Sequence, residues 1–348
     1  MTIEEIAKLA GVSTGTVDRV LHNRGRVSPV TRERVLAIIK EQNFKPNAFA
    51  RNLKLNKEFR IGVLLPLLHS EYGYWNLIYQ GIINAAKELS DLSVKIDVYE
   101  FDRQKGGSCF EAGRRMLKNP VDAFILAPVC PDDAKLVLAA HPDIDCIFID
   151  TSMPQPHRAS SVTQNPYKAG YLAGRMMNLL SPNPGTYAVA LTHRAAYNAS
   201  ERARGFKEFC ARQEGMRTKT VELNFEGNWE KILEDLYVTT TDIQGVFVVN
   251  DSVHRVASHI NLIGHRPKTT IIGFDLIVQN RKEMENGIID CLISQRPEFQ
   301  GYSAVYQLYR KGILNQQLEK ETEIPIDIIL PENLSSTESM DYIPRIRS

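Results

Sequence analysis

Apolar side chains in the first 21 residues recur every three or four positions, the spacing of one helix face. The first run predicts a helix from about residue 3 to residue 10, because it follows Thr2, an N-cap residue type, and places apolar groups at Ile3, Ile6, Ala7 and Ala10. Gly11 ends this helix, and Ser13 can cap a second helix with an apolar face of Val17, Val20 and Leu21. The other face of the second helix carries Thr14, Gly15, Asp18 and Arg19. Two short helices joined by a tight glycine turn are typical of a helix-turn-helix, whose second helix can enter a major groove.

A third helix is predicted after Ser28 and Pro29, which are a cap and a first-turn proline. It should extend to a break at residues 43–46 and complete a small three-helix core through Val30, Val35, Leu36, Ile38 and Ile39. Beyond the break, Asn47 can cap one more helix over residues 48–54. That helix has too few residues to be stable alone in water.

From Arg60 onward, short apolar runs alternate with amphipathic stretches, as in a parallel sheet covered by helices. The first set predicts strands over 61–66, 94–101, 123–127 and 146–150, with helices over 75–89, 108–118 and 132–140. The second set predicts strands over 187–192, 218–223, 246–249 and 270–274, with helices over 166–180, 200–214, 229–237 and 252–263. A strand over 290–293, a helix over 297–310 and a strand over 324–330 complete the chain. Two successive doubly wound units indicate two lobes with a cleft at the carboxyl ends of their strands, where such sheets bind ligands.

Charge is distributed unevenly along the 348 residues, although the formal total is only +1. Residues 1–60 hold 12 Lys and Arg against 6 Asp and Glu, a formal +6, whereas the remainder holds 30 against 35, a formal −5. A basic amino-terminal region suits contact with phosphates. An ordinary excess of solvated charge is the alternative, and the helix-turn-helix pattern favours the first interpretation.

The cysteines and the start of the sequence indicate the cellular compartment. The five cysteines are odd in number and scattered, as expected of reduced, mostly buried thiols in a cytoplasmic protein. The sequence opens directly on the first predicted helix, with no signal peptide and no apolar run long enough to cross a bilayer. We therefore expect a cytoplasmic, nucleoid-associated protein with no membrane partner.

Patterns for catalysis are missing from the sequence. It has no nucleophile elbow, no P-loop, no Gly-x-Gly-x-x-Gly after a strand and no metal-ligand cluster among its eight histidines. Acids at strand ends, such as Asp150 and Asp275, could form a carboxylate pair for glycoside chemistry, but their positions in the sequence do not set the distance between them. We expect no enzyme activity, no cofactor and no metal.

Three stretches of the amino-terminal region belong together. They read Thr2-Ile3-x-x-Ile6-Ala7-x-x-Ala10-Gly11-Val12-Ser13-x-x-Thr16-Val17-x-Arg19-Val20-Leu21, then Val27-Ser28-x-x-Thr31-Arg32-x-Arg34-Val35, then Lys45-Pro46-Asn47-Ala48-x-Ala50-Arg51-x-Leu53. Together they closely resemble the DNA-binding headpiece of LacI/GalR-family transcription regulators. The match continues ungapped through the turn, the third helix and the segment after it.

The resemblance implies that Thr14, Gly15 and Arg19 occupy positions that reach base edges, with Arg19 placed for a bidentate contact to guanine. Gly15 has no side chain, so one common base contact is missing. Asp18 stands where relatives mostly carry serine; its carboxylate must accept from cytosine N4 or be held by a neighbouring arginine, because phosphate would repel it. Further phosphate or base contacts are implied by position for Ser13, His22, Asn23, Arg26 and Thr31.

The segment over 47–59 resembles the hinge helix and linker of the same family, with DNA contacts implied for Asn47, Ala50, Arg51 and Leu53. Leu53 resembles the apolar wedge that paired hinge helices push into the minor groove at the centre of an operator. Such a short helix gains its stability from DNA and from its two-fold partner. The resemblance therefore implies a homodimer, or a tetramer, that reads a pseudo-palindromic operator in double-stranded DNA.

The segment from Arg60 to about Leu330 resembles type I periplasmic-binding-protein-like sensor domains, in which the chain crosses three times between two lobes. The expected fold is an all-α helix-turn-helix headpiece over 1–46, the hinge and linker over 47–59, and an α/β two-lobed sensor domain over 60–348. On that template lobe 1 spans about 60–162 plus 295–323, and lobe 2 about 164–293 plus 326–348.

The resemblance also implies which residues contact a small-molecule effector. Tyr74 and Trp75 sit where sugar-binding relatives place an aromatic pair that covers the ligand, although the preceding Asn-Pro of the relatives is Tyr72-Gly73 here. Packing in the core is the alternative for both rings. Arg202, in Asn198-x-x-x-Arg202-x-x-Gly205-Phe206, matches an arginine that points at ligand hydroxyls with a fork of donors. A surface salt bridge is the alternative for Arg202.

The other implied effector contacts are polar residues at strand ends. Asn250 and Asp251 resemble a pair that binds sugar hydroxyls, and a cap of the following helix is an alternative that can hold at the same time. Gln295 matches a glutamine at a lobe crossing, and Asp275 belongs to a strand-end signature, as a direct contact or as a support for one. An aromatic pair surrounded by Asn, Asp, Arg and Gln favours a neutral polyol or sugar over a purine.

These features together predict a sequence-specific DNA-binding transcriptional regulator, of the repressor type, whose operator affinity is set by a small molecule, a sugar or a sugar derivative. The alternative is a sugar-binding or sugar-processing component with an accessory DNA-binding module. A transport binding protein would need an export signal, whereas this sequence opens on a DNA-binding helix pattern.

Overall fold

The computed structural model describes residues 3–21, 25, 27–42, 58–68, 73–154, 159–192 and 196–337. The chain divides into two compact units, 1–57 and 58–348. We call them the headpiece and the sensor unit and describe each by itself. Seven predicted DNA contacts lie outside the described residues, as do the hinge helix and most of the linker; these contacts are His22, Asn23, Arg26, Asn47, Ala50, Arg51 and Leu53.

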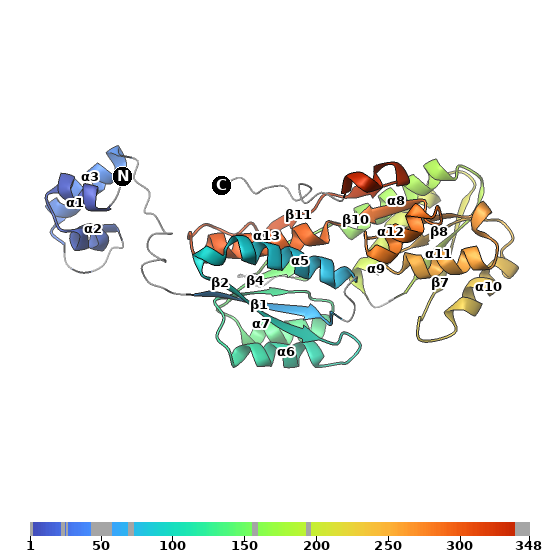
Figure 1. Cartoon of the computed structure of the whole chain (residues 1–348), viewed down its shortest axis with the longest axis horizontal. Helices are drawn as coiled ribbons and strands as arrows, with labels where there is room; N and C mark the ends of the chain where they lie inside the picture. Colours follow the sequence, from blue (N-terminus) through green and yellow to red (C-terminus); the bar gives the residue numbers. More distant parts are fainter. Residues whose placement is uncertain are drawn as a thin grey trace. The chain divides into compact units, whose positions relative to one another are not determined.

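The headpiece holds three helices around a small core (Figure 1): α1 (Ile3–Ala10), α2 (Thr14–Leu21) and α3 (Pro29–Glu41). Their starts and ends confirm the prediction. The reasons are local, because Gly11 has the left-handed φ of +64°, and Ser13 and Ser28 each accept from a backbone N–H three residues ahead. The core consists of Ile6, Ala7, Ala10, Val17, Val20 and Val35.

Two predicted core positions of α3 are wrong. Val30 is 73% exposed and Leu36 is also exposed, while Ile38 and Ile39 only pack partly against the core. A core this small covers a narrow stripe of α3, so only Val35 of that helix is fully buried.

The first lobe of the sensor unit is a parallel sheet with the strand order β11-β5-β4-β3-β1-β2. Its strands are β1 (Phe59–Pro66), β2 (Val94–Phe101), β3 (Ala123–Leu126), β4 (Asp145–Ile149), β5 (Ala159–Thr163) and β11 (Glu321–Glu323). Helices α5 (Tyr74–Glu88) and α13 (Pro297–Gly312) pack on one face, and α6 (Ser108–Leu117) and α7 (Pro131–Ala140) on the other (Figure 1). A short 3₁₀ turn at Ser90–Leu92 precedes β2. Because both faces are covered, the inner strands β1, β3 and β4 are apolar along most of their length.

The second lobe repeats this plan with the order β12-β10-β9-β8-β6-β7, in which only β12 runs antiparallel. Its strands are β6 (Gly185–Leu191), β7 (Met216–Glu222), β8 (Ile243–Val248), β9 (Thr270–Phe274), β10 (Cys291–Ser294) and β12 (Asp327–Ile329). Helices α8 (Pro166–Leu180) and α9 (Tyr197–Ala211) cover one face, and α10 (Trp229–Thr239) and α11 (Val253–Leu262) the other. Helix α12 (Val278–Glu285) packs beside α11, and 3₁₀ turns lie at Arg266–Lys268 and Pro331–Thr337.

The chain passes between the lobes after β5, after β10 and after β11. Gln164, at the first passage, joins all three, because its Nε2 donates to the Ser294 carbonyl at 3.1 Å and to the Pro325 carbonyl at 3.0 Å. Arg296 also links the second passage to the third through a bidentate pair with Asp327 at 2.7 and 2.8 Å. The hinge is therefore held by the buried side chain of Gln164 and by the partly buried pair of Arg296 and Asp327.

Three elements escape the sequence pattern. Strand β5 and helix α12 were not predicted, and the single strand expected over 324–330 is the short β12, with β11 pairing separately in the other lobe. Strand β5 reads Ala-Ser-Ser-Val-Thr and α12 is almost wholly polar, so neither carries an apolar period. Among the described helices, none combines the length and apolar character needed to cross a membrane.

Candidate functional site

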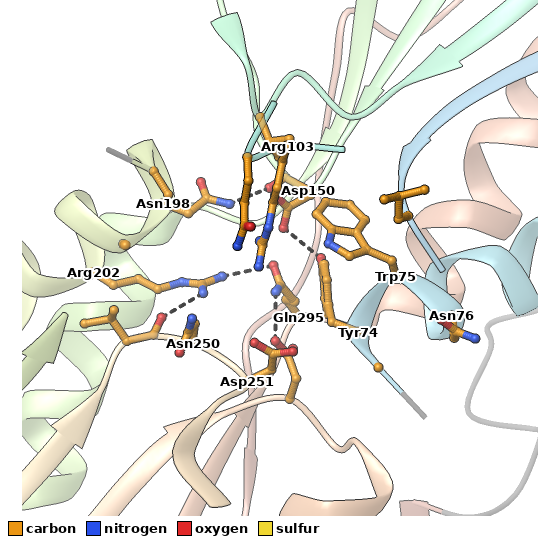
Figure 2. Close-up of a pocket in the computed structure, with 18 residues that line it drawn as sticks. Tyr74, Trp75, Asn76, Arg103, Asp150, Asn198, Arg202, Asn250, Asp251 and Gln295 are labelled. Atoms are coloured by element: carbon orange, nitrogen blue, oxygen red, sulfur yellow. Dashed lines mark hydrogen bonds between the residues drawn. The ribbon is translucent and has the colours of Figure 1, made fainter. Parts of the chain in front are cut away.

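A cavity of about 330 Å³ lies between the lobes of the sensor unit, at the carboxyl ends of the strands. Its size is at the lower end of the range for small-molecule pockets, about 300–1,000 Å³. All eight residues predicted from the resemblance line it: Tyr74, Trp75, Asn198, Arg202, Asn250, Asp251, Asp275 and Gln295. Figure 2 labels all of them except Asp275 and shows the labelled side chains converging from helices α5 and α9 and from the strand ends.

The lobe-1 wall is built on Asp150, which directly follows β4 and has a left-handed φ of +65°. The Tyr74 hydroxyl donates to the Asp150 carboxylate at 2.8 Å. Burial raises the pKa of both the Asp150 carboxyl and the Tyr74 phenol. Trp75 stands edge-on to Tyr74 with ring centroids 5.0 Å apart. Tyr74 packs in the core of lobe 1 as well as lining the cavity, so the alternative interpretation of that ring also holds.

The lobe-2 wall is built around Arg202, which is only 4% exposed. Its guanidinium lies 3.8 Å from the centroid of the Phe274 ring and donates to the Val249 carbonyl and to Gln295 Oε1, each at 3.0 Å. These contacts exclude the alternative of a surface salt bridge. The position of Arg202 depends on a close approach of helices α8 and α9. A Cβ on Gly170 of α8 would lie 1.9 Å from the Arg202 carbonyl oxygen of α9.

Asp275 is the most perturbed acid of the cavity. It follows β9 with a φ of +67°, is 2% exposed, and receives a hydrogen bond from Gln295 Nε2 at 3.2 Å on Oδ2. Among the described residues its Oδ1 has no hydrogen-bond partner. Burial raises the pKa of Asp275 to about 8, against an attraction to Arg202 that lowers it. Asp275 is therefore mostly protonated at neutral pH and can donate as well as accept.

Two buried amides that do not line the cavity hold these acids through their backbones. Gln300 of α13 accepts from the Asp150 backbone N–H at 2.8 Å, and its Nε2 donates to the Gln295 carbonyl at 2.8 Å. Asn280 of α12 donates to the carbonyls of Asp251 and Asp275, each at 2.9 Å. Both amides are fully buried, so each lobe fixes its own acidic turn from behind.

Asn250 and Asp251 follow β8 at the rim of the cavity. The Asn250 amide donates to the Thr192 hydroxyl, and its oxygen accepts from the Ser252 backbone N–H at 3.2 Å. This second bond lies in the turn ahead of α11. The N-cap of α11 is Ser252 and no side chain caps that helix, so the alternative of a helix cap for Asn250 and Asp251 is wrong.

Sequence reasoning missed several lining residues. Arg103 and Gln104 follow β2 and line the same cavity, as does Asn76 on the first turn of α5. Figure 2 labels Arg103 and Asn76. The carboxyl-end rule could have identified Arg103 and Gln104, because they stand directly after a predicted strand. Asp150 was noted only as an isolated acid. Among the described residues, no three potential ligands group as a metal site.

In the headpiece, α2 turns Val17 and Val20 inward and leaves Thr14, Gly15, Asp18 and Arg19 exposed. One of the predicted contacts, Ser13, already caps a helix, and another, Thr31, contacts Ser28, the N-cap of α3. The Ser13 side chain accepts from the Thr16 N–H, and the Thr31 hydroxyl accepts from Ser28 at 2.8 Å. The exposed face of α2 is thus the candidate nucleic-acid surface.

A known protein family matches each of the two units, the headpiece and the sensor unit. Residues 2–47 match the family described as "Bacterial regulatory proteins, lacI family", and residues 61–313 match the family described as "Periplasmic binding protein domain". The HTH-type transcriptional repressor PurR of Proteus mirabilis is 30% identical over 178 residues, which is 51% of this chain and 50% of that protein. PurR of Vibrio vulnificus is 29% identical over 292 residues, covering 79% of this chain and 82% of that protein.

Solved structures support the fold of the sensor unit. A proposed LacI transcriptional regulator from Bacteroides fragilis superposes with a TM-score of 0.74 at 22% identity, covering 80% of this chain and 99% of that one. GanP, a glucose-galactose binding protein from Geobacillus stearothermophilus, gives 0.70 at 23% identity, with coverages of 80% and 99%. The chain spans about half the length of the Proteus mirabilis relative.

Proposed function

The chain belongs to the lacI family of bacterial regulatory proteins, and we propose that it is a sequence-specific DNA-binding transcriptional regulator, of the repressor type, controlled by a small molecule. The observation that carries this proposal is the headpiece, in which α2 keeps its small polar face exposed while its apolar face completes a three-helix core. The formal +6 of residues 1–60 supplies the attraction to phosphates. Such a protein acts at the chromosome, in the cytoplasm.

The proposed arrangement on DNA is a dimer on a pseudo-palindromic operator. Arg19 would read guanine from the major groove, flanked by Thr14, Gly15 and Asp18. The segment over 47–59 would act as a hinge helix that folds when Leu53 enters the minor groove. Pairing of two dimers into a tetramer is compatible with this arrangement.

The proposed effector is a neutral sugar or polyol bound in the cavity between the lobes. The cavity offers the chemistry that adjacent hydroxyls require, with the Arg202 guanidinium as a donor, Asp251 as an acceptor and Trp75 as a flat apolar surface. GanP, which shares the fold, is a glucose-galactose binding protein. Effector binding would shift the angle between lobes and couple to operator affinity by about 1–3 kcal/mol.

Selection of bound duplexes from a random library tests the regulator proposal. We expect enrichment of a palindrome, with an affinity that falls steeply between 50 and 200 mM salt, because phosphate contacts release counterions. The control is the Arg19→Ala variant, which should lose the enrichment of one base pair in each half-site. Binding without any sequence preference would refute the proposal.

A thermal-shift screen of sugars, polyols and sugar acids tests the effector. A true effector should raise the melting temperature of the full chain in proportion to the logarithm of its concentration, and the Asp251→Asn variant should weaken that response. Stabilisation by a purine base and by no sugar would overturn the sugar assignment while leaving the DNA result intact.

A further inference from the structure

Helix α8 of lobe 2 has one face in the core and the opposite face at the surface. The inner face packs against α9 and the sheet through small side chains such as Ala173. Four residues spaced four, three and four apart lie on the opposite face: Lys168, Leu172, Arg175 and Leu179. Leu172 is partly buried, and the other three are exposed. A cation therefore alternates with a leucine at the spacing by which one helix packs on another, and we call this row the α8 seam.

An open groove of about 530 Å³ runs beside the α8 seam. Its walls come from α8, from Arg212 directly after α9, and from Ile326 in the third passage between the lobes. Leu172 of the seam also lines it, so the groove offers apolar surface from two elements. The groove shares no lining residue with the first cavity, and a partner that binds here is therefore separate from the proposed effector.

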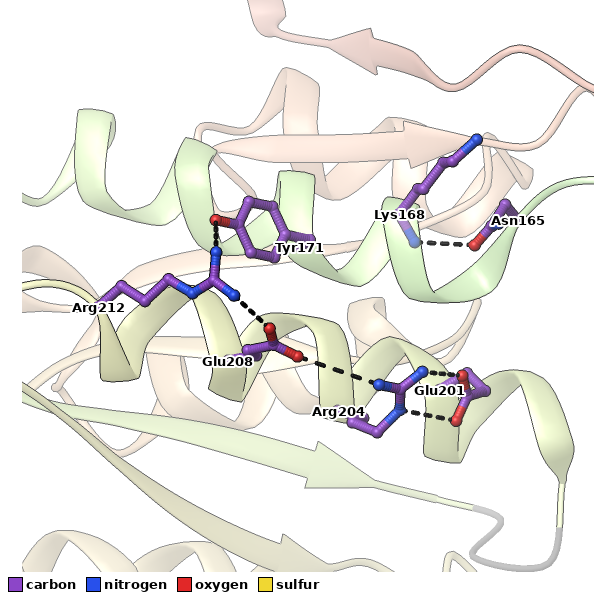
Figure 3. Close-up of polar contacts among 7 residues, drawn as sticks. All are labelled: Asn165, Lys168, Tyr171, Glu201, Arg204, Glu208 and Arg212. Carbon is purple, nitrogen blue, oxygen red and sulfur yellow. Dashed lines mark hydrogen bonds and ion pairs between the residues drawn. The ribbon is translucent and has the colours of Figure 1, made fainter.

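The charge of the groove favours an acidic partner. Its lining residues include three cations, Lys168, Arg175 and Arg212, and no carboxylate in the part of the chain that the structure describes. Arg212 is held within the protein, because it pairs with Glu208 and donates to the Tyr171 hydroxyl at 3.3 Å (Figure 3). The other two cations decide what the groove can bind.

Both cations of the α8 seam can pair with a carboxylate from outside. Arg175 forms no ion pair with any described residue and lies 5.2 Å from the centroid of the Phe209 ring. The Lys168 side chain extends away from α9 in Figure 3 and pairs with Glu323 at 2.8 Å. Both partners of that pair are more than half exposed, and such pairs contribute only about 0–1 kcal/mol. A carboxylate of a partner can therefore replace Glu323 at little cost.

The apolar side chains of the seam narrow the class of partner. Leu179 is 64% exposed, and neither a small anion nor the phosphate backbone of a nucleic acid would cover it. A second copy of this chain would bring leucines, but a two-fold contact of the seam with itself gathers Lys168 and Arg175 from both copies around one axis without a carboxylate. The partner must supply apolar side chains and carboxylates together.

We propose that the α8 seam and its groove dock an acidic amphipathic helix of another protein. Leucine-like side chains of that helix pack on Leu172 and Leu179 and reach Ile326 in the groove. Carboxylates seven residues apart on the partner, about 10.5 Å along its axis, lie opposite Lys168 and Arg175, which have the same separation.

Docking at this groove would also contact the hinge. Ile326 lies in the third passage, next to Asp327, whose bidentate pair with Arg296 links that passage to the second. A change of the lobe angle would alter the wall of the groove, and by linkage the effector and the docked helix would change each other's affinity by the same factor. Only this linkage rests on the proposed effector; the docking claim does not.

The test is fluorescence anisotropy of labelled three-heptad helical peptides titrated with the full chain. The first peptide alternates leucine and glutamate along one face, the second replaces each glutamate of that face by lysine, and the third replaces each leucine by serine. We expect the first peptide to bind at least tenfold more tightly than either of the others, because the seam requires both charge and apolar contact. Added salt should weaken its binding, since the paired charges are exposed.

The location of the peptide is tested by variants of the seam. Arg175→Gln and Leu179→Ser should each weaken binding of the leucine–glutamate peptide at least fivefold. The matched controls are Arg114→Gln and Leu117→Ser, which change an exposed cation and an exposed leucine on α6 of lobe 1 and should keep the wild-type affinity. Circular dichroism of each variant checks that it is folded.

Several results would overturn the proposal. They are no binding of the leucine–glutamate peptide up to 500 µM, equal binding of the three peptides, or an equal loss in the seam and α6 variants. A change in the sedimentation of the full chain caused by Leu179→Ser without peptide would instead make the seam a contact between copies. Binding of single-stranded oligothymidine that Arg175→Gln abolishes would make it a nucleic-acid surface. None of these outcomes depends on operator binding, so a failure here leaves the regulator proposal standing.

Discussion

Asp275 should make the folding stability of the chain depend on pH between about 4 and 8. Its carboxyl has an ordinary pKa of 3.8 and a pKa of about 8 in the folded protein, because burial disfavours the charged form. Below pH 3.8 the group is protonated in both states and its full contribution to stability is present. As the pH rises through 8, that contribution is lost. The difference between the ordinary pKa and the pKa in the folded protein corresponds to roughly 6 kcal/mol of folding stability, at about 1.36 kcal/mol per pKa unit.

The quantity to measure is the slope of folding stability against pH. Between pH 5 and pH 7 the folded chain holds one proton more than the unfolded chain at this site, so stability should fall by about 3 kcal/mol over that range. Asp275→Asn removes the titration while preserving an oxygen that can accept from Gln295 Nε2. Urea midpoints of the wild type and the variant at pH 5, 6 and 7, at one protein concentration, give the difference.

The matched control for this prediction is Asp251→Asn, which replaces another acid of the same cavity, one that is only partly buried. The Asp251 charge is one cause of the raised pKa of Asp275, so Asp251→Asn should lower the pH at which the slope ends. The Asp275 carboxyl still titrates in this variant, so its stability should still fall between pH 5 and pH 7. Equal slopes for the wild type and Asp275→Asn would refute the assignment of a raised pKa to Asp275.

Three further predictions concern other parts of the chain. Gly170→Ala should cost about 1–3 kcal/mol of stability by urea denaturation, because its Cβ would meet the Arg202 carbonyl, whereas Gly106→Ala, with nothing within 4 Å, should be nearly neutral. Leu53→Ala should weaken operator binding in a gel shift while effector affinity stays nearly constant; an unchanged operator affinity would count against a wedge. Arg19→Ala should cost about 1–3 kcal/mol in operator affinity and relax specificity at one base pair per half-site, and a uniform loss across all sequences would point to a phosphate contact instead.

How far the fold could be predicted depended on whether local chemistry or tertiary contacts determine each element. The limits of α3 follow from Ser28 and Pro29, which act within one helical turn. Strand β5 could not be predicted, because Ser160 and Ser161 are buried between two strands that only the folded lobe brings beside them. Helix α12 has two apolar residues, the buried Met284 and the exposed Val278, and Asn280 ties it to the end of β9 through the Phe274 carbonyl.

The residues of the candidate site also differ in whether local sequence or tertiary contacts determine their role. Side chains that point into the cavity, such as Arg202 and Gln295, stand at strand ends or on family motifs and could be predicted from the sequence. Gln300 and Asn280 could not, because they act on backbone groups of residues 150, 251 and 275 and leave no pattern of their own. Supports of this kind become visible only when the hydrogen bonds of the strand-end turns are traced.

The two lobes hold their strand-end acidic turns in the same way. Asp150 and Asp275 each follow a strand in a left-handed turn, a conformation that costs energy for a residue with a side chain, and a fully buried amide holds each turn through its backbone. In lobe 1 that amide, Gln300, also donates to the carbonyl of Gln295, whose side chain contacts both Arg202 and Asp275. A displacement of Asp150 therefore acts on the second passage between the lobes through a single side chain. The proposed effector, bound between the two acids, would therefore contact residues that this network joins to the hinge.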